Sequence, residues 1–511
     1  MQDSSDRELS KKMIGNTSPD QSKQATGNKP HSSQSGQQEG AITRRYESIA
    51  LVVVLMGLMM TAIDTTAVVL ALPVMTADLN SNILSMIWVI MAYLLVLTIF
   101  GTQVGRLGDM LGRVRMYNVG FAIFTVGSLL CGLSQTGSQI IDFRILQGLG
   151  GALVFSNSGA IIADTVPEAR RGRAYGLTGI GYSGGAILGI LVGGALITFL
   201  NWRYIFYINV PIGTAAVLVS YLVLKERSPR TSRKLDFFGM GLLGAGLFLI
   251  LYALTEITGS GVTRSSSFEL LAGALTIAGF VFWERFFSSP LLDLSLLRQR
   301  VLTASIFAAF FQALASYAVL FLVIMYLQGV RGLTPFNASI LLIPGYLLVA
   351  VFAPFAGRLS DKYGARLIAS IGLVLIAAGI LTYATLAIDS PLWIVVIGSI
   401  FNGVGQSFFY PSNNSSVMAS APPKAFGVTS GLLRTFSNTG MVSSFAIALL
   451  IASTSIPRQT AFSIFLGVSK LTLNLSGAFV TGMHAALLVS IALITVALVL
   501  SILKGSSMTR R

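Results

Sequence analysis

Asp64 is an acidic residue in the middle of an apolar run that extends from about Ile49 to Val74. If this run is a helix across a bilayer, Asp64 lies roughly 15 Å from its outer end. A charge at that depth costs on the order of 3 kcal/mol or more, so Asp64 should face a cavity or a partner. Because burial favours a protonated carboxyl and a nearby cation favours a carboxylate, changing surroundings would bind or release a proton. We predict a proton-coupling role; the alternative is a structural aspartate bonded to Thr61 and Thr65.

Two arginines are the other deep charges. Arg144 lies in the apolar run 140–163 at a depth similar to that of Asp64, with Gln147 one helical turn further on. We predict that Asp64 and Arg144 form the proton-coupling pair and that Gln147 supplies hydrogen bonds; the alternative is a permanent ion pair. Arg434 has no acidic neighbour within its own run, so substrate, a carbonyl group or a helix end is its expected partner.

Aromatic and amide side chains recur in the second half of the chain, a combination suited to lipophilic ligands with few hydrogen-bonding groups. Aromatic faces also hold organic cations. The predicted cavity residues are Gln147, Phe310, Phe311, Gln312, Gln406, Tyr410, Asn413 and Arg434, with Tyr317 and Phe409 in the same pattern. Because the apolar runs hold hardly any deep acid besides Asp64, we expect neutral, zwitterionic or singly charged ligands. Packing is the alternative role for each aromatic ring.

A glycine-rich charged segment occurs twice. It reads G-R-L-G-D-M-L-G at 105–112 and returns 252 residues later as G-R-L-S-D-K-Y-G at 357–364. A short loop of this kind lets two helix ends approach, so Asp109 is expected against the N-terminus of a neighbouring helix, with Arg113 nearby. The duplication favours a cytoplasmic gate over a loop that only fixes topology. The predicted gate residues are Gly105, Asp109, Gly112, Arg113, Gly357, Asp361 and Gly364.

The composition requires lipid around much of the chain. Of 511 residues, 53% are hydrophobic and 11% are charged, whereas a soluble protein carries about 25% charge. A run of about 20 apolar residues can cross a bilayer as a helix. We predict fourteen such spans, at residues 49–74, 84–104, 115–134, 140–163, 173–199, 204–224, 236–256, 268–287, 301–328, 336–356, 367–387, 391–415, 427–451 and 483–503.

The positive charges support this span count. If the N-terminus is cytoplasmic, 23 Lys and Arg residues lie on the inner side and five on the outer side, a strong positive-inside bias. The net charge of +15 then reflects topology, and nucleic acid is not an expected partner. A single cysteine, Cys131, and two histidines exclude an intrachain disulfide framework and a Cys/His metal cluster.

The chain also repeats itself over a longer range. Q-G-L-G at 147–150 returns 255 residues later as N-G-V-G at 402–405, which indicates two related bundles of the kind that transporters build around a central cavity. We therefore expect an all-α polytopic membrane protein with two six-helix bundles and two inserted central helices. The predicted segments are a disordered cytoplasmic tail (1–43), an N-terminal bundle (44–227), linker helices (228–290), a C-terminal bundle (291–505) and a cytoplasmic tail (506–511).

Several of these motifs resemble the major facilitator superfamily, specifically its 14-helix drug:proton antiporter family. They are I-D-T-T at 63–66, the duplicated 105–112 segment, R-I-L-Q-G at 144–148 and N-W-R at 201–203. The resemblance covers about residues 46–505 and implies a rocker-switch fold with substrate held between the halves. The fifth-helix antiporter motif retains the glycines Gly185, Gly189, Gly193 and Gly194, but Ile190 replaces its usual proline. Close packing should survive, whereas a proline-dependent kink is lost.

The function predicted from these features is proton-coupled export of drug-like lipophilic or monocationic small molecules. Two alternatives stay open: a proton-coupled importer of a nutrient or metabolite, and a non-transporting membrane receptor or scaffold. An enzyme is not expected, because the chain has no G-x-x-x-x-G-K-[S/T] loop and no metal-ligand cluster. No cofactor is expected; the expected partners are substrate, protons and the bilayer. We predict a monomer in the plasma membrane with both termini cytoplasmic.

Overall fold

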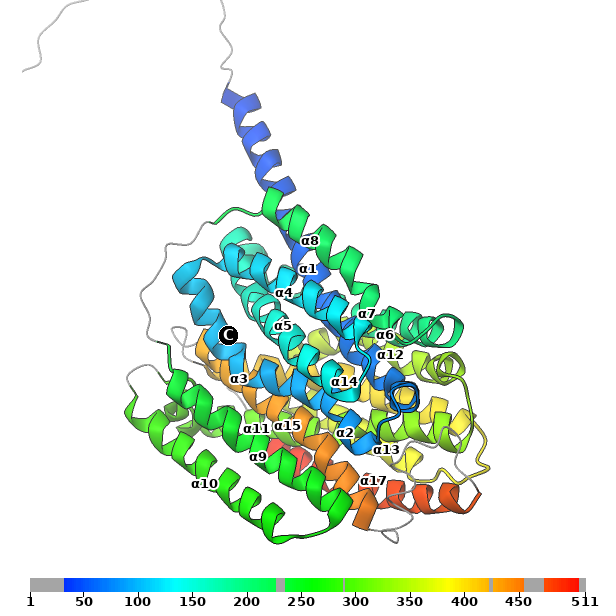
Figure 1. The fold of residues 1–511 in the computed structure, drawn as a ribbon. Coiled ribbons are helices and arrows are strands. Elements are labelled where there is room, and N and C mark those ends of the chain that lie inside the picture. Colours follow the sequence, from blue (N-terminus) through cyan, green and yellow to red (C-terminus); the bar gives the residue numbers. More distant parts are fainter. Residues whose placement is uncertain (1–31, 227–234, 288–289, 422–425, 455–472, 505–511) are drawn as a thin grey trace, which may run out of the picture. The chain divides into compact units, whose positions relative to one another are not determined.

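The computed structural model describes residues 32–226, 235–287, 290–421, 426–454 and 473–504, and every regular element among them is a helix (Figure 1). The chain divides into two units, Met1–Tyr46 and Glu47–Arg511, and apart from the start of α1 the helices belong to the second. The first half of this second unit contains α1 (Ser32–Asp78), α2 (Ile83–Met86), α3 (Trp88–Leu111), α4 (Arg113–Leu133), α5 (Gly137–Thr165), α6 (Glu168–Phe199), α7 (Tyr204–Tyr207) and α8 (Asn209–Val223).

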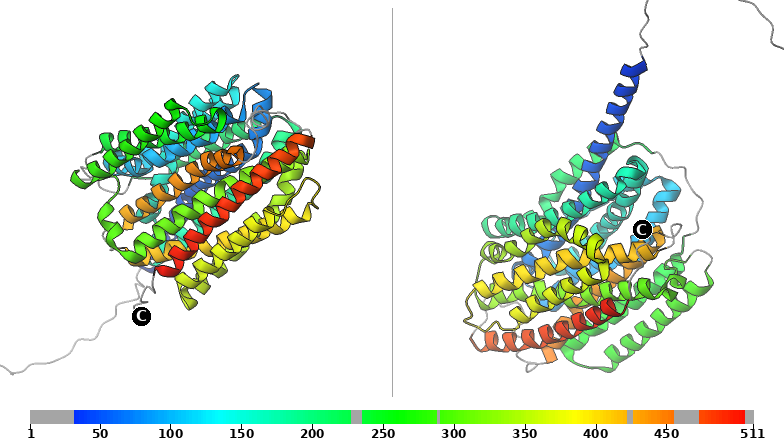
Figure 2. Two further views of the ribbon diagram at one scale, coloured as in Figure 1. Left: turned by 90° about the horizontal axis from the view of Figure 1, so that it is seen from below. Right: turned by 180° about the vertical axis from the view of Figure 1, so that it is seen from behind.

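Two inserted helices, α9 (Phe237–Ser260) and α10 (Arg264–Phe286), pack against each other at one edge of the second unit (Figures 1 and 2). The second half then contains η1 (Leu294–Arg298), α11 (Arg300–Met325), the π-helical turn η2 (Tyr326–Val330), α12 (Pro335–Tyr363), α13 (Ala365–Tyr383), α14 (Trp393–Ser420), α15 (Phe426–Thr454) and α17 (Leu473–Leu503).

Fourteen helices in the described part of the chain are long and apolar enough to cross a membrane, which confirms the predicted number of spans. The last of them was predicted too short: α17 begins at Leu473, not at 483. Polar residues and glycines between 473 and 482 lower the local hydropathy. Gly482 nevertheless lies against the backbone of Ala452, because a Cβ atom built on Gly482 would be 2.6 Å from the Ala452 carbonyl oxygen. Close helix packing therefore extends this helix beyond its most apolar part.

The predicted disordered tail also overlaps a helix, because α1 begins at Ser32 and not after residue 43. The sequence of residues 32–43 is polar and has few apolar side chains. An existing helix adds residues at its end more easily than a new one forms. The apolar span that comes next in the chain therefore accounts for this N-terminal extension.

The two predicted gate loops are much shorter than expected. α3 continues through Gly105 and Asp109 to Leu111, and α12 continues through Gly357 and Asp361 to Tyr363. Only Gly112 separates α3 from α4, and only Gly364 separates α12 from α13. These two glycines have φ values of 112° and 92°, a region that residues with a side chain rarely enter.

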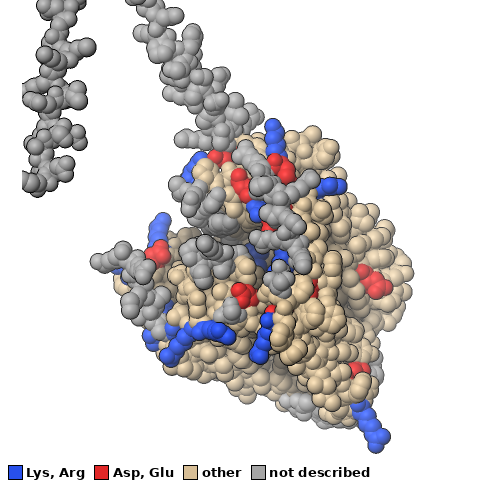
Figure 3. All heavy atoms as spheres, turned by 90° about the vertical axis from the view of Figure 1, so that its left-hand side faces the viewer, with Lys and Arg blue, Asp and Glu red and all other residues tan. Residues whose placement is uncertain are grey.

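The end of the unit at which α3 and α12 terminate is named the Gly112 end. The end at which α6 terminates is named the Thr198 end. Successive membrane-length helices run in opposite directions between these two ends (Figure 1). Figure 3 shows the face that lies to the left in Figure 1, where Lys and Arg side chains are interspersed with Asp and Glu.

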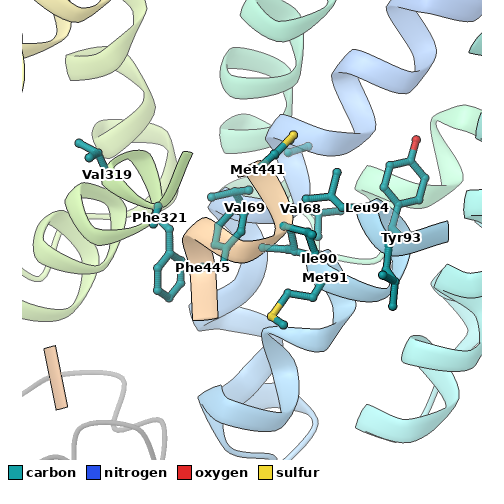
Figure 4. Packing of buried hydrophobic residues seen from close by; sticks show 14 of the residues in the cluster. Val68, Val69, Ile90, Met91, Tyr93, Leu94, Val319, Phe321, Met441 and Phe445 are labelled. Carbon is teal, nitrogen blue, oxygen red and sulfur yellow. The ribbon is translucent and has the colours of Figure 1, made fainter. Parts of the chain in front are cut away.

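The two halves share one hydrophobic core. In Figure 4, Met441 and Phe445 of α15 lie beside Val68 and Val69 of α1, with Ile90, Met91 and Leu94 of α3 next to them. The ring of Phe445 lies 6.1 Å from that of Phe321 in α11. All of these side chains are buried, so α15 joins its own half to helices of the other half.

Candidate functional site: a buried ion pair beside a tyrosine-lined region

Asp64 of α1 and Arg144 of α5 form an ion pair inside the first half. The Nη1 atom of Arg144 lies 2.5 Å from Oδ2 of Asp64, and each residue is 1% exposed. The sequence alone placed both charges at a similar depth, and the structure brings them into direct contact. A buried charge needs such a partner, because removing one member of a buried pair costs about 3–5 kcal/mol.

Gln147 ties this pair to the surrounding helices. Its amide nitrogen donates to Oδ1 of Asp64 at 2.8 Å and to the hydroxyl of Ser128 at 2.7 Å. Its carbonyl oxygen accepts from Nη1 of Arg144 at 2.6 Å. Gln147 is fully buried, and the structure places it directly beside the ion pair.

Two further side chains, those of Tyr93 and Asn209, contact the ion pair. The guanidinium of Arg144 lies 4.1 Å from the ring centroid of Tyr93, and its Nε donates to the carbonyl of Val89 at 2.9 Å. The side-chain amide of Asn209 reaches Oδ1 of Asp64 at 3.5 Å. Tyr93 and Asn209 were not selected from the sequence; an amide and a phenol within apolar helices were the available signals.

Glycines of α6 hold α1 in place around Asp64. An ideal Cβ on Gly189 would lie 2.6 Å from the carbonyl oxygen of Ile63 and 2.0 Å from the Thr66 hydroxyl. Gly185 and Gly193 approach Met59 and Ala67 in the same way. Only residues without a side chain allow backbones to approach this closely. The fifth-helix glycine motif therefore packs directly on the helix segment that carries Asp64.

At the Thr198 end the two halves are hydrogen-bonded to each other. The amide of Gln328, in the π-helical turn η2, donates to the carbonyl of Leu70 at 3.0 Å. The backbone N–H of Phe336 donates to the Thr198 hydroxyl at 3.0 Å. Gly194, the last glycine of the motif, lies against Ser339 of α12. These contacts close the Thr198 end in this conformation.

The first gate segment forms a charge cluster within one half. Arg113 lies 2.7 Å from Asp109 and 2.6 Å from Asp164 of α5, so it joins α4 to α3 and α5. Asp109 was expected against a helix N-terminus, but that position belongs to Glu226. The two carboxylate oxygens of Glu226 accept from the backbone N–H groups of Arg113 and Val114 at 3.0 and 3.1 Å.

The second gate segment lacks this cluster. Asp361 is exposed, and among the described residues it forms no ion pair. The position that corresponds to Arg113 is Ala365, 252 residues further on. The duplicated glycines therefore preserve the sharp helix connection, whereas the charge network is present in the first half only, within the described part of the chain.

The predicted cavity residues separate into two groups. Asn413 is 1% exposed and donates to the Ser305 carbonyl at 3.0 Å, so it joins α14 to α11. Phe409 is completely buried against Gly372. Gln312 is also buried and donates to Ser316 at 3.2 Å. The partly exposed members are Phe310, Phe311, Tyr317, Gln406 and Tyr410. The side-chain amide of Gln406 donates a hydrogen bond to the side-chain oxygen of Asn402.

Two members of this second group, Tyr317 and Tyr410, lie near two further tyrosines, Tyr182 and Tyr346. The phenol groups of Tyr182, Tyr317, Tyr346 and Tyr410 lie close enough to interact electrostatically. Tyr182 comes from α6, whereas the other three come from α11, α12 and α14. We call this set the tyrosine cluster. Tyr182 and Tyr346 were missed in the sequence because single tyrosines in apolar helices carry no periodic signal.

Arg434 lies next to the first half. Its guanidinium carbon is 4.5 Å from the ring centroid of Phe155 in α5, and the Phe155 ring is 6.3 Å from that of Tyr182. The Arg434 residue is exposed. A solvent-accessible positive charge therefore lies beside the aromatic surface between the two halves.

Fourteen membrane-length helices, two related halves and a polar, aromatic region between them define a polytopic transport protein. No group of three or more metal-ligating side chains is present in the described part of the chain. The sequence model of the Major Facilitator Superfamily matches residues 54–444 and 305–504. The chain belongs to this superfamily, and it is a transporter of this type and not an enzyme.

Curated relatives include a vitamin transporter and a drug-export protein. Riboflavin transporter RibZ of Clostridioides difficile (strain 630) is 32% identical over 395 residues, covering 76% of this chain and 85% of the relative. The tetracenomycin C resistance and export protein of Streptomyces glaucescens is 30% identical over 407 residues, covering 79% and 76%. The relatives support transport of small molecules in general, without deciding its direction.

Solved structures show the same fold at low sequence identity. A bacterial homologue of the human lysosomal transporter Spinster, inward-facing and occupied, superposes with a TM-score of 0.65 and 17% identity. The alignment covers 90% of this chain and 97% of that one. The peptide transporter POT in complex with sulfate gives a TM-score of 0.63 at 16% identity, covering 89% and 96%.

Proposed function

We propose that this protein is a proton-coupled exporter of lipophilic small molecules in the plasma membrane, working by alternating access with Asp64 as the proton-carrying group. The observation that carries the proposal is the Asp64–Arg144 ion pair, 2.5 Å apart and almost fully excluded from solvent. A structural core of this size has no need for two charges whose burial costs several kcal/mol each. A proton-linked transport cycle does need a carboxyl group whose pairing with a positive charge changes between conformations.

The conformation supports a specific place in that cycle. The Thr198 end is closed by the Gln328–Leu70 and Phe336–Thr198 hydrogen bonds, and we assign this end to the outside. Asp64 is then paired with Arg144 in an inward-facing state. Opening of the Thr198 end would separate η2 from α1 only six residues from Asp64, which provides a route for a proton. Protonation would neutralise Asp64 and weaken its bond to Arg144.

The tyrosine cluster and Arg434 support a substrate preference. Phenol groups offer flat apolar faces with one polar atom each, which suits lipophilic aromatic compounds. The exposed guanidinium of Arg434 lies beside the Phe155 ring and can donate hydrogen bonds to an anionic or electron-rich group of a substrate. We therefore propose neutral, zwitterionic or anionic aromatic substrates, and the monocations expected from the sequence become the less favoured class.

The proposal is tested in proteoliposomes with an imposed proton gradient and a panel of lipophilic aromatic compounds. D64N should abolish gradient-driven transport while leaving substrate binding measurable. D361N is the matched control, since it removes an exposed carboxylate that has no described ion pair. The double variant D64N/R144Q removes both charges and tests whether any loss in D64N reflects misfolding. Full gradient-driven transport by a folded D64N protein would refute the role of Asp64.

Import of a nutrient is the second candidate, and the relation to the riboflavin transporter of C. difficile favours it. Riboflavin is a neutral aromatic compound, which the tyrosine cluster would also accept. Uptake of labelled riboflavin into right-side-out cells, compared with efflux from preloaded cells, separates the two directions. Uptake that exceeds efflux and depends on Asp64 would replace export with import.

A further inference from the structure

A cavity lies at the Thr198 end, and none of the four residues of the tyrosine cluster lines it. It has a volume of about 420 Å³ and is bounded by the start of α3 and the end of the inserted helix α9. Its lining includes Asn82, Trp88, Ile141, Tyr252, Glu256 and Gly259. The cavity thus opens where the inserted pair meets the first half, a place that the proposed transport cycle does not use.

One wall of this cavity is aromatic. The ring of Trp88 lies 5.4 Å from that of Phe248 and 6.3 Å from that of Tyr252, and the last two rings stack 5.8 Å apart. Trp and Tyr faces attract cations within about 6 Å. Both residue types also concentrate at membrane–water interfaces, where lipid headgroups are found.

The cavity also contains a carboxylate. Oε1 of Glu256 accepts a hydrogen bond from the Thr263 hydroxyl at 2.9 Å. Thr263 is itself fixed as the N-cap of α10 by a capping box with Ser266. Within the described residues no Lys or Arg lies at ion-pairing distance from Glu256. The carboxylate is therefore oriented by the protein, and its charge is compensated by none of these side chains.

The surroundings of the cavity fit a lipid better than a soluble ion. Phe248 and Tyr252 are 43% and 45% exposed along α9, which gives an apolar surface leading away from Glu256. Leu271 and Leu275 of α10 are 59% and 63% exposed. Arg264 follows Thr263 directly and is exposed at the start of α10. A carboxylate, a guanidinium and an apolar surface match the three parts of a zwitterionic phospholipid.

We propose that this cavity binds a phospholipid with a primary-ammonium headgroup. The ammonium group lies between Trp88 and Tyr252 and donates to Glu256, the phosphate is directed to Arg264, and an acyl chain follows α9. Because α9 packs on α3 and also on α15, the bound lipid connects the inserted helices to both halves. The inference does not depend on the direction of transport.

Native mass spectrometry of the full-length chain, titrated with phosphatidylethanolamine, phosphatidylcholine and phosphatidylglycerol, tests this site. The wild type should bind phosphatidylethanolamine about tenfold more tightly than phosphatidylglycerol, and E256Q should lose this preference, as expected when one charge-assisted hydrogen bond is removed. T263V should cause a smaller loss, because it only releases the orientation of Glu256. The matched control D389N removes an exposed acid at the same end of the unit and should keep the preference.

Three results would overturn the proposal. Equal affinities of the wild type for the three lipids would remove the ammonium specificity. An unchanged preference in E256Q and T263V, or an equal loss in D389N, would remove the assignment to this cavity. Binding of tetraethylammonium in isothermal titration calorimetry that phosphatidylethanolamine does not displace would replace the lipid with a soluble cation. If E256Q does not fold, T263V and a W88L variant carry the same test.

Discussion

The two halves share their backbone contacts but differ in the chemistry they carry. Gly127 lies against Gln147 in the first half, and Gly379 lies against Asn402 at the corresponding place in the second, with ideal Cβ approaches of 2.8 and 2.9 Å. Gln147 bonds to the Asp64–Arg144 pair, whereas Asn402 bonds to Gln406. At the position corresponding to Arg144 the second half has Ser399.

The charge cluster at the Gly112 end follows the same division. Arg113 and Asp164 correspond to Ala365 and Ala419, and Gly108 and Asn157 correspond to Ser360 and Ser412. The hydroxyl groups of Ser360 and Ser412 are buried without a hydrogen-bond partner among the described residues. Helix packing has thus been retained in both halves, while the ion pairs of the described residues all lie in the first half and partly exposed aromatic and amide groups lie in the second. The comparison favours proton coupling in one half and much of the substrate surface in the other.

The largest predicted effect comes from removing Arg144. R144L should lower the free energy of unfolding by about 3–5 kcal/mol, because the buried Asp64 loses its only described charged partner. S399A, at the corresponding place in the second half, should change it by less than about 1 kcal/mol, the usual range of a single neutral hydrogen bond. Chemical denaturation in detergent measures both. Similar losses in the two variants would contradict the division between the halves.

Lys504 provides the second test of the difference between the halves. It is a buried cation of the second half that contacts a hydroxyl group, whereas Arg144 contacts a carboxylate. It is 1% exposed, and its ammonium donates to the Ser416 hydroxyl at 3.1 Å. Burial, and to a smaller extent the charge of Arg366, lower the pKa of Lys504 to about 8 from its ordinary 10.5. The folded protein therefore loses this proton near pH 8 and the unfolded chain near pH 10.5.

The unfolded chain binds more protons between these two values, so stability should rise by about 3 kcal/mol as the pH increases from 8 to 10.5. In K504M this contribution is absent, so the stability of K504M should not show this rise between pH 8 and pH 10.5. Melting temperatures of the wild type and K504M at matched pH values provide the measurement. A wild-type profile that falls over this window relative to K504M would show that Lys504 is stabilised as a cation.

The matched glycines separate packing from coupling. G127A and G379A should each lower stability by about 1–3 kcal/mol, because an added methyl group overpacks a close helix contact. Only G127A should reduce gradient-driven transport, since the methyl group displaces Gln147 from Asp64. Proteoliposome transport is compared after both variants have been shown to fold by thermal melting. Equal losses of transport would mean that packing alone controls the rate.

The smallest predicted effect concerns the charge cluster at the Gly112 end. R113A removes two partly exposed ion pairs with Asp109 and Asp164 and should cost about 1 kcal/mol. D361A in the other half should cost nothing measurable. High salt should reduce the difference in stability between R113A and the wild type, because Arg113, Asp109 and Asp164 are partly exposed to solvent. A difference that is independent of salt would indicate that Arg113 acts through packing.

The sequence predicted the number of spans because hydropathy and charge bias act over long segments. It also selected Asp64, Arg144 and Gln147, because polar groups in an apolar run have few alternatives to pairing. It did not predict that Glu226 caps α4, since the two are over a hundred residues apart and meet only after folding. It did not predict that Asn413 is hydrogen-bonded to α11, because an amide at a helix face looks the same in the sequence whether the face meets a cavity or another helix. Helix orientation, which decides between them, depends on all the neighbouring helices.

The single-residue connections at Gly112 and Gly364 have a consequence for spectroscopy. Two helices joined by one residue have no slack, so α3 and α4 turn together, as do α12 and α13. Spin labels placed within either pair should report one narrow distance in every state of the protein. Labels placed across the halves, for example near Thr198 and Asn337, should report a distribution that broadens or splits when substrate is added.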